Sequence, residues 1–129
     1  MILLGALSFV AAQATAIPIS GDWTNSARSV VVQVAPCGSA ICGTVKWASE
    51  NAKNDARRAG TQSLIGTEVL HEFKPVRPGH WRGSLFVPDR KLRSRAELIE
   101  IGPDRVRIRA CTAGGLLYKS KAWDRVNVP

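Results

Sequence analysis

Hydrophobic and polar side chains alternate with a period of two along most of this chain, and that alternation restricts its fold more than any other feature. Successive side chains of a β-strand point to opposite faces of a sheet, so each alternating segment is expected to be a strand with one face against a core. Amphipathic-helix periodicity is scarce. The eight predicted strands cover residues 22–25, 29–35, 41–48, 64–73, 80–87, 93–101, 105–111 and 116–126.

Turn-forming residues separate the predicted strands, and short strands at such spacing predict an antiparallel barrel or sandwich. The segment 49–63 differs, because it is polar and rich in Ala, Asn, Lys and Arg; we expect a long loop there with one short helix. At 129 residues and 45% hydrophobic content, the chain is long enough for one domain with one core. The expected turns lie at 36–38, 75–79, 88–89, 102–104 and 114–115.

The first 21 residues carry no charge, and an apolar run covers residues 2–12. Small residues at Ala14 and Ala16 provide an A-x-A cleavage pattern after either position. The pattern predicts a secretory signal peptide over residues 1–16 and a single mature domain over 17–129, although the positive charges typical of the start of a signal peptide are missing.

A membrane anchor is the weaker interpretation of the same stretch. A spanning helix needs about 20 apolar residues, and this run reaches Pro18 only by including Gln13 and Thr15. We therefore expect a secreted or periplasmic protein that does not span the membrane.

Positive charge is concentrated in the second half of the sequence. The formal net charge is +8; residues 74–129 hold thirteen basic and five acidic side chains, whereas residues 1–73 hold five of each. A basic half attracts anionic partners, but it is also typical of a solvated face that aids solubility. Nucleic acid is not an expected partner, because export removes the protein from it and the sequence has no recognition helix or stacking-aromatic motif.

The first predicted hairpin can be put in register by matching side chains. Placing Cys37 opposite Cys42 makes one face apolar and the other largely polar. Directly opposed residues have Cα atoms about 4.5–5.5 Å apart, which suits a disulfide in an oxidising compartment. The other pairs expected in this register are Val34–Val45, Val32–Trp47, Ala35–Thr44 and Gln33–Lys46.

In a second predicted hairpin, Ile101 pairs with Val106 and Ile99 with Ile108 across the turn 102–105. The opposite face then carries three arginines at a period of two. A polar outer face is one interpretation of this pattern, and an anion-binding stripe is the other. The residues of that face are Arg105, Arg107 and Arg109, with Glu100 near Arg107 and Leu98 as the main apolar member.

Signals for catalysis are largely missing. His71 and His80 are the two histidines, and neither has a second ligand at metal spacing, so we predict no metal site and no cofactor. The Cys-x4-Cys spacing fits a structural bridge better than a redox centre. Cys111 is the odd cysteine, either a small buried hydrophobe or a reactive or intermolecular thiol.

Several motifs together resemble the bacterial exported family of domain of unknown function 2147, over residues 21–126. The P-C-G-x-x-x-C-G core is the specific part of the resemblance. It implies a secreted or periplasmic, lipocalin-like antiparallel β-barrel of about eight strands with no established enzymatic activity. The motifs are Gly21-Asp22-Trp23, Pro36-Cys37-Gly38-Ser39-Ala40-Ile41-Cys42-Gly43 with Trp47, Leu64-Ile65-Gly66-Thr67, Trp81-Arg82-Gly83, Val87-Pro88-Asp89 and Lys119-Ser120-Lys121-Ala122-Trp123-Asp124-Arg125.

The sequence departs from this family in one place. Many members of the family carry a second Cys before the Lys that corresponds to Lys119, able to pair with the one at Cys111, and this chain has Tyr118 there. The departure implies that Cys111 is left single.

The resemblance to lipocalins further implies that Arg125, near the end of the last strand, stacks on Trp23 in the first strand and closes one end of the barrel. A buried cation–π contact contributes about 2 kcal/mol. The alternative is a core Trp and a surface Arg that never touch.

An eight-stranded barrel is either filled by its own side chains or holds one small ligand. Our leading hypothesis is an exported, non-enzymatic envelope protein that binds a small apolar or amphipathic molecule inside the barrel, with Val32, Trp47, Trp81 and Leu85 as ligand-binding residues. The side chains expected inside are Val32, Val34, Val45, Trp47, Trp81, Leu85, Val87, Ile99, Ile101, Val106 and Ile108.

The alternative hypothesis is a surface-interaction module. Its barrel would be solid, and its arginine face would dock on anionic lipid, lipopolysaccharide or an acidic partner protein; an enzyme is the least favoured class, because no catalytic constellation is present. The arginines of that face are Arg105, Arg107 and Arg109, with Arg93 and Arg95.

Overall fold

The computed structural model describes residues 19–112 and 117–126. The predicted signal peptide, 1–16, lies outside these residues. No helix within the described ranges has the length and apolar character needed to cross a membrane.

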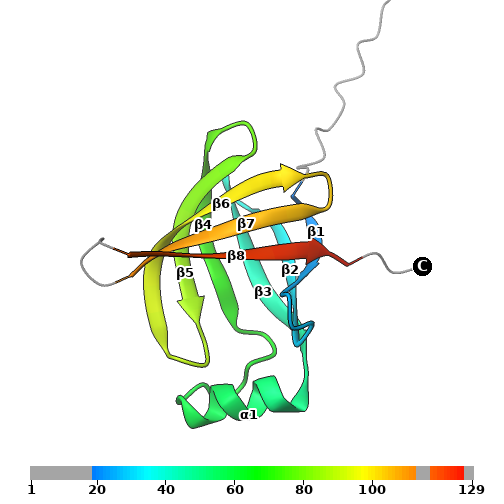
Figure 1. Ribbon diagram of the computed structural model, residues 1–129, viewed down its shortest axis with the longest axis vertical. Helices are drawn as coiled ribbons and strands as arrows, with labels where there is room; N and C mark the ends of the chain where they lie inside the picture. The colour runs from blue at the N-terminus through cyan, green and yellow to red at the C-terminus, as the bar shows by residue number, and fades with distance from the viewer. Residues whose placement is uncertain (1–18, 113–116, 127–129) are drawn as a thin grey trace, which may run out of the picture.

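Eight antiparallel strands form a closed barrel in which each strand pairs with the next along the chain and the last pairs with the first (Figure 1). The predicted barrel is therefore confirmed, and the sandwich is excluded. Closure satisfies the backbone groups that an open sheet would leave exposed at its edges. The elements are β1 (Gly21–Thr24), β2 (Val30–Cys37), β3 (Ala40–Ala48), α1 (Glu50–Arg58), β4 (Glu68–Arg77), β5 (His80–Val87), β6 (Leu92–Gly102), β7 (Arg105–Thr112) and β8 (Leu117–Arg125).

Helix α1 occupies the segment in which we expected one short helix. The Ser49 side chain accepts a hydrogen bond from the backbone N–H of Ala52 and caps the first turn. Arg57 and Arg58 lie in the last turn, where cations interact favourably with the helix dipole. Ala56 is buried in the core cluster, so α1 covers the end of the barrel opposite the β4–β5 turn (Figure 1).

Side chains of the described residues pack closely in the middle of the barrel. Two glycines face large neighbours: a Cβ at Gly83 would lie 2.6 Å from Phe73 Cδ1, and one at Gly43 would lie 2.9 Å from Leu70. The absence of a side chain at these two positions lets Leu70 and Phe73, both fully buried, occupy the space. The other core residues are Ile19, Trp23, Val32, Val34, Ile41, Val45, Ala48, Ala56, Leu64, Val69, Trp81, Leu85, Ala96, Leu98, Val106 and Ile108.

The predicted register of the first hairpin was wrong by two residues. Cys37 pairs with Ala40, because the turn is a tight one in which Gly38 adopts a φ of 68°. A shift of two keeps each side chain on its predicted face, so Val32, which now pairs with Val45, remains inside.

The Cys37–Cys42 disulfide is confirmed, but its residues are diagonal neighbours rather than directly opposed. Cys42 pairs with Ala35 in the ladder, and the two cysteine Cα atoms are 5.8 Å apart. Diagonal pairs in a twisted hairpin come close enough for such a bond.

Trp47 lies outside the barrel, so its predicted position inside, from which its role in ligand binding was inferred, was wrong. A bulge between Val31 and Val32 places Trp47 opposite Val31, and 48% of its surface is exposed. A bulge inserts one extra residue into a strand and thereby changes which face the following side chains occupy.

The predicted register of the second hairpin was wrong by one residue, which exchanges the two faces of β6 and leaves those of β7 as predicted. Leu98 pairs with Ile108 and is 1% exposed, whereas Ile101 is 41% exposed and Ile99 lies outside the core cluster. The cause is a register shift between Glu100 and Gly102 next to a shorter turn than predicted. Glu100 consequently shares the inner face of β6 with Leu98.

Candidate functional site

Trp23 lies at the seam where the barrel closes. It pairs with Arg125 across β1 and β8, and the guanidinium carbon of Arg125 is 4.4 Å from the centroid of the indole ring. The Trp23 indole N–H donates to the carbonyl oxygen of Ile19 at 2.8 Å. Trp23 is 1% exposed: the guanidinium covers the face of its ring, and the carbonyl oxygen accepts from its N–H.

Arg125 is held in that position by the chain around it. Its Nη1 donates to the Ser20 carbonyl oxygen at 2.9 Å, and its Nε lies 3.2 Å from Asp104 Oδ1 in the β6–β7 turn. A Cβ at Gly21, whose φ is +133°, would lie 2.8 Å from Arg125 Nη1. Glycine at this position therefore lets the guanidinium pass close to the backbone and reach Trp23.

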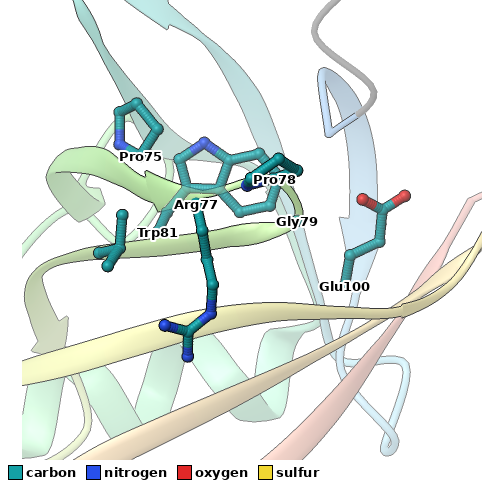
Figure 2. A pocket seen from close by; sticks show the side chains of 7 residues that line it. Pro75, Arg77, Pro78, Gly79, Trp81 and Glu100 are labelled. Carbon is teal, nitrogen blue, oxygen red and sulfur yellow. The ribbon is translucent and has the colours of Figure 1, made fainter.

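A pocket with a volume of about 550 Å³ opens at the β4–β5 turn, at the end of the barrel away from α1 (Figures 1 and 2). The end of β4, the two turn residues that follow it, and one residue each of β5 and β6 form its wall. The lining residues are Pro75, Val76, Arg77, Pro78, Gly79, Trp81 and Glu100.

The sequence of the turn accounts for a rigid and mostly apolar wall. Pro75 and Pro78 have a fixed φ, and Gly79 adopts a φ of 75°, which glycine accepts without strain. The backbone N–H of Glu100 donates to the Gly79 carbonyl oxygen at 2.8 Å, which fastens the turn to β6. Val76 remains exposed beside the opening.

Trp81 and Glu100 are diagonal neighbours on the inner face. Trp81 pairs with Leu98, and Glu100 is the next residue of β6 on that side; such diagonal positions lie roughly 7–8 Å apart. The Glu100 carboxylate is half-buried, and among the described residues it has no recorded ion pair or hydrogen bond. The guanidinium of Arg77 points away from it (Figure 2).

Three of the predicted ligand-binding residues lie inside the barrel, but they do not form one site. Trp81 lines the pocket, whereas Val32 and Leu85 are packed in the filled core. Sequence reasoning missed Glu100, because the predicted register placed it on the outer face. The two prolines of residues 75–79 were the sequence feature that could have identified the rest of the pocket wall.

The predicted arginine stripe lies on the outer face of β7, with Arg105 and Arg107 exposed and Arg109 half-buried. Arg105 Nε donates to Asp124 Oδ1 at 2.7 Å. That hydrogen bond raises the pKa of the Arg105 guanidinium and lowers the pKa of the Asp124 carboxyl. Asp124 therefore neutralises one end of the stripe.

Arg93 and Arg95, on the outer face of β6, extend the same basic surface. Both are exposed, and the Arg93 guanidinium lies over the Phe86 ring at 4.9 Å. The surface is thus a set of cations on β6 and β7, with Glu97 and Asp124 as its acidic members.

Neither histidine forms a metal site. The exposed His71 contacts Glu68 and lies 3.7 Å from Glu72; His80 Nε2 is buried without a hydrogen-bond partner, 3.4 Å from Glu97 Oε2. No group of three potential metal ligands occurs among the residues that the structure describes.

The Cys111 side chain is outside what the structure describes, so whether it is free stays a prediction. Its backbone pairs with that of Tyr118, the position at which relatives are expected to carry a second Cys.

Comparisons with known proteins agree with the barrel. The profile of a family described as "Uncharacterized protein conserved in bacteria (DUF2147)" matches residues 21–125. The structure of protein HP1028 from the human pathogen Helicobacter pylori, described as belonging to the lipocalin family, superposes with a TM-score of 0.63 and covers 84% of this chain and 82% of its own. At 10% sequence identity this likeness establishes the fold alone. No curated protein matches the sequence.

Proposed function

Because the chain belongs to the bacterial DUF2147 family and folds as a lipocalin-like barrel, we propose that it is a non-enzymatic binding protein whose ligand is a small amphipathic molecule. The ligand would occupy the pocket at the β4–β5 turn rather than the filled centre of the barrel. This position replaces the interior site that the sequence suggested.

The observation that carries the proposal is an open, mostly apolar pocket beside a core in which the described side chains of Leu70 and Phe73 are fully buried and closely packed. Small-molecule sites usually have volumes of about 300–1,000 Å³ and combine apolar walls with a few polar groups, and a pocket of about 550 Å³ with prolines, Trp81 and one carboxylate fits that description. The fixed backbone of the turn supports binding, because little conformational entropy would be lost.

We also propose that the protein works in the periplasm or outside the cell. The Cys37–Cys42 disulfide supports this location, since such bonds persist in oxidising compartments and are rare in the cytosol.

The experiment is an NMR titration with straight-chain alcohols, followed through the indole N–H resonances of the four tryptophans. We expect the Trp81 resonance to shift, with affinity rising about fourfold for each added methylene until the pocket is full. Trp81→Phe assigns the resonance, and Trp47→Phe, on the outside of the barrel, is the matched control. A titration in which no alcohol moves the Trp81 signal would exclude the pocket as a ligand site.

A second candidate function is supported by the basic outer surface of β6 and β7. Exposed Arg93, Arg95 and Arg107 would dock on a lipid surface that presents phosphate groups. Binding to vesicles of anionic phospholipid or to lipopolysaccharide, abolished by moderate salt and by combined Arg95→Gln and Arg107→Gln, would support it. Binding to an acidic protein without vesicle binding would identify a protein partner instead, and salt-resistant binding would favour the pocket.

A further inference from the structure

Two tryptophans, Trp23 and Trp81, are buried in the core of the barrel, and their surroundings differ. The Trp23 ring is covered by the Arg125 guanidinium, and its N–H is bonded to Ile19. Over the described ranges, Trp81 has neither a recorded cation on its ring nor a hydrogen-bond partner for its N–H. Trp81 is 7% exposed and belongs to the core cluster, and its accessible part lines the pocket wall.

The face of an indole ring attracts cations, because its π electrons make that face electrostatically negative. The Trp23–Arg125 pair shows this attraction used within the protein. A ligand cation over Trp81 would meet the same kind of surface, in a pocket whose other atoms are mostly apolar.

Glu100 adds a second group that attracts cations, because its carboxylate carries a negative charge. Its carboxylate lines the pocket one diagonal step from Trp81, and its Oε2 is 3.5 Å from the point where a Cβ on Gly79 would stand. A half-buried carboxylate loses part of its hydration without gaining a counter-charge, so a ligand that brings a positive group gains more there than in water.

We propose that the pocket selects amphipathic molecules that carry an ammonium group, primary or quaternary, held between the Trp81 ring and the Glu100 carboxylate. The apolar part of the ligand then lies against Pro75, Val76 and Pro78. This inference rests on the proposed function, because it specifies the chemistry of the ligand for the same pocket.

The overall charge of the protein opposes the predicted binding of cations. At +8, the chain repels cations and attracts anions at long range. Arg77 also borders the pocket, although its guanidinium is directed away from Glu100 (Figure 2). A preference for cations must therefore arise from contacts within the pocket.

The test compares three ligands that share an eight-carbon chain: octyltrimethylammonium, octan-1-ol and octanoate. Affinities are measured by calorimetry and by the Trp81 indole resonance, at neutral pH and below the micelle concentration of each ligand. We expect the ammonium compound to bind about five- to tenfold more tightly than the alcohol, and octanoate to bind more weakly than both.

Variants separate the two contacts. Glu100→Gln should reduce the affinity for octyltrimethylammonium to near that of octan-1-ol and leave the alcohol unaffected. Trp81→Leu, which keeps an apolar wall but removes the ring, should also reduce the preference for the cation. Glu97→Gln is the matched control, since it removes the same charge from the outer face of the same strand; it should change neither affinity. Thermal melting of each variant verifies that it is folded.

The outcomes distinguish this inference from the proposed function. Equal binding of all three ligands, or tighter binding of octanoate, overturns the selection of ammonium groups and leaves the pocket as a ligand site. A cation preference that survives Glu100→Gln overturns the role of the carboxylate. Failure of all three ligands to move the Trp81 resonance overturns the proposed function together with the inference.

Discussion

Trp23 and Trp81 both lie in the core of one barrel, but among the described residues a cation covers the ring of Trp23 and none covers the ring of Trp81. Arg125 and the Ile19 carbonyl cover Trp23, whereas Trp81 borders an open pocket with an unpaired carboxylate as its neighbour, within the part of the chain that the structure describes. The Trp23 contacts join the first and last strands, and the Trp81 side is where we propose that a ligand binds.

The largest expected effect is that of Trp23→Ala. Truncating a fully buried Trp costs about 3–5 kcal/mol, a large part of the free energy of unfolding of a domain this size, which is about 5–15 kcal/mol. Urea denaturation would measure it. Trp47→Ala, at a half-exposed position outside the barrel, should cost far less; equal losses would mean that the seam contributes no special stability.

Arg125→Ala should have a smaller but clear effect. It removes a stacked cation worth about 2 kcal/mol and leaves the Trp23 face uncovered, so the melting temperature should fall by several degrees. Arg77→Ala, at the open side, is the control and should melt close to the wild type. An Arg125→Ala protein that melts like the wild type would show that the guanidinium does not hold the seam.

Glu100→Gln should leave stability nearly unchanged, within about 0.5 kcal/mol, because the carboxylate has no recorded partner to lose among the described residues. The same substitution is expected to alter ligand selection. A loss of stability as large as that of Arg125→Ala would make Glu100 a structural residue and remove the contrast between the two sides.

The smallest effect is expected on the outer side of the seam. Arg105 lowers the pKa of Asp124 in the folded protein, so this pair stabilises the fold above the ordinary carboxyl pKa, and that contribution is lost as the pH falls through the lowered value. Asp124→Asn should therefore lose slightly less stability than the wild type during acidification. Melting curves between neutral pH and pH 2 would show it; identical pH profiles would contradict the role of the pair.

The strands were predictable from the sequence because alternation is a local property. Alternation left a barrel and a sandwich both open, and closure was implied only by the family resemblance. Register was not, because it depends on turn length and bulges. The bulge at Val31 placed Trp47 outside, and the shorter β6–β7 turn exchanged Leu98 with Ile99 and brought Glu100 inside. An error of two residues in the predicted register of the first hairpin moved no side chain to the other face. An error of one residue in the second hairpin placed Glu100 on the outer face, so its position in the pocket was missed.

The packing of Phe73 against Gly83 has a consequence for how cargo would be exchanged. A molecule that cannot sink into the middle of the protein stays at the rim with part of its surface in water. A second macromolecule could then take it over directly, without any strand separating from its neighbour.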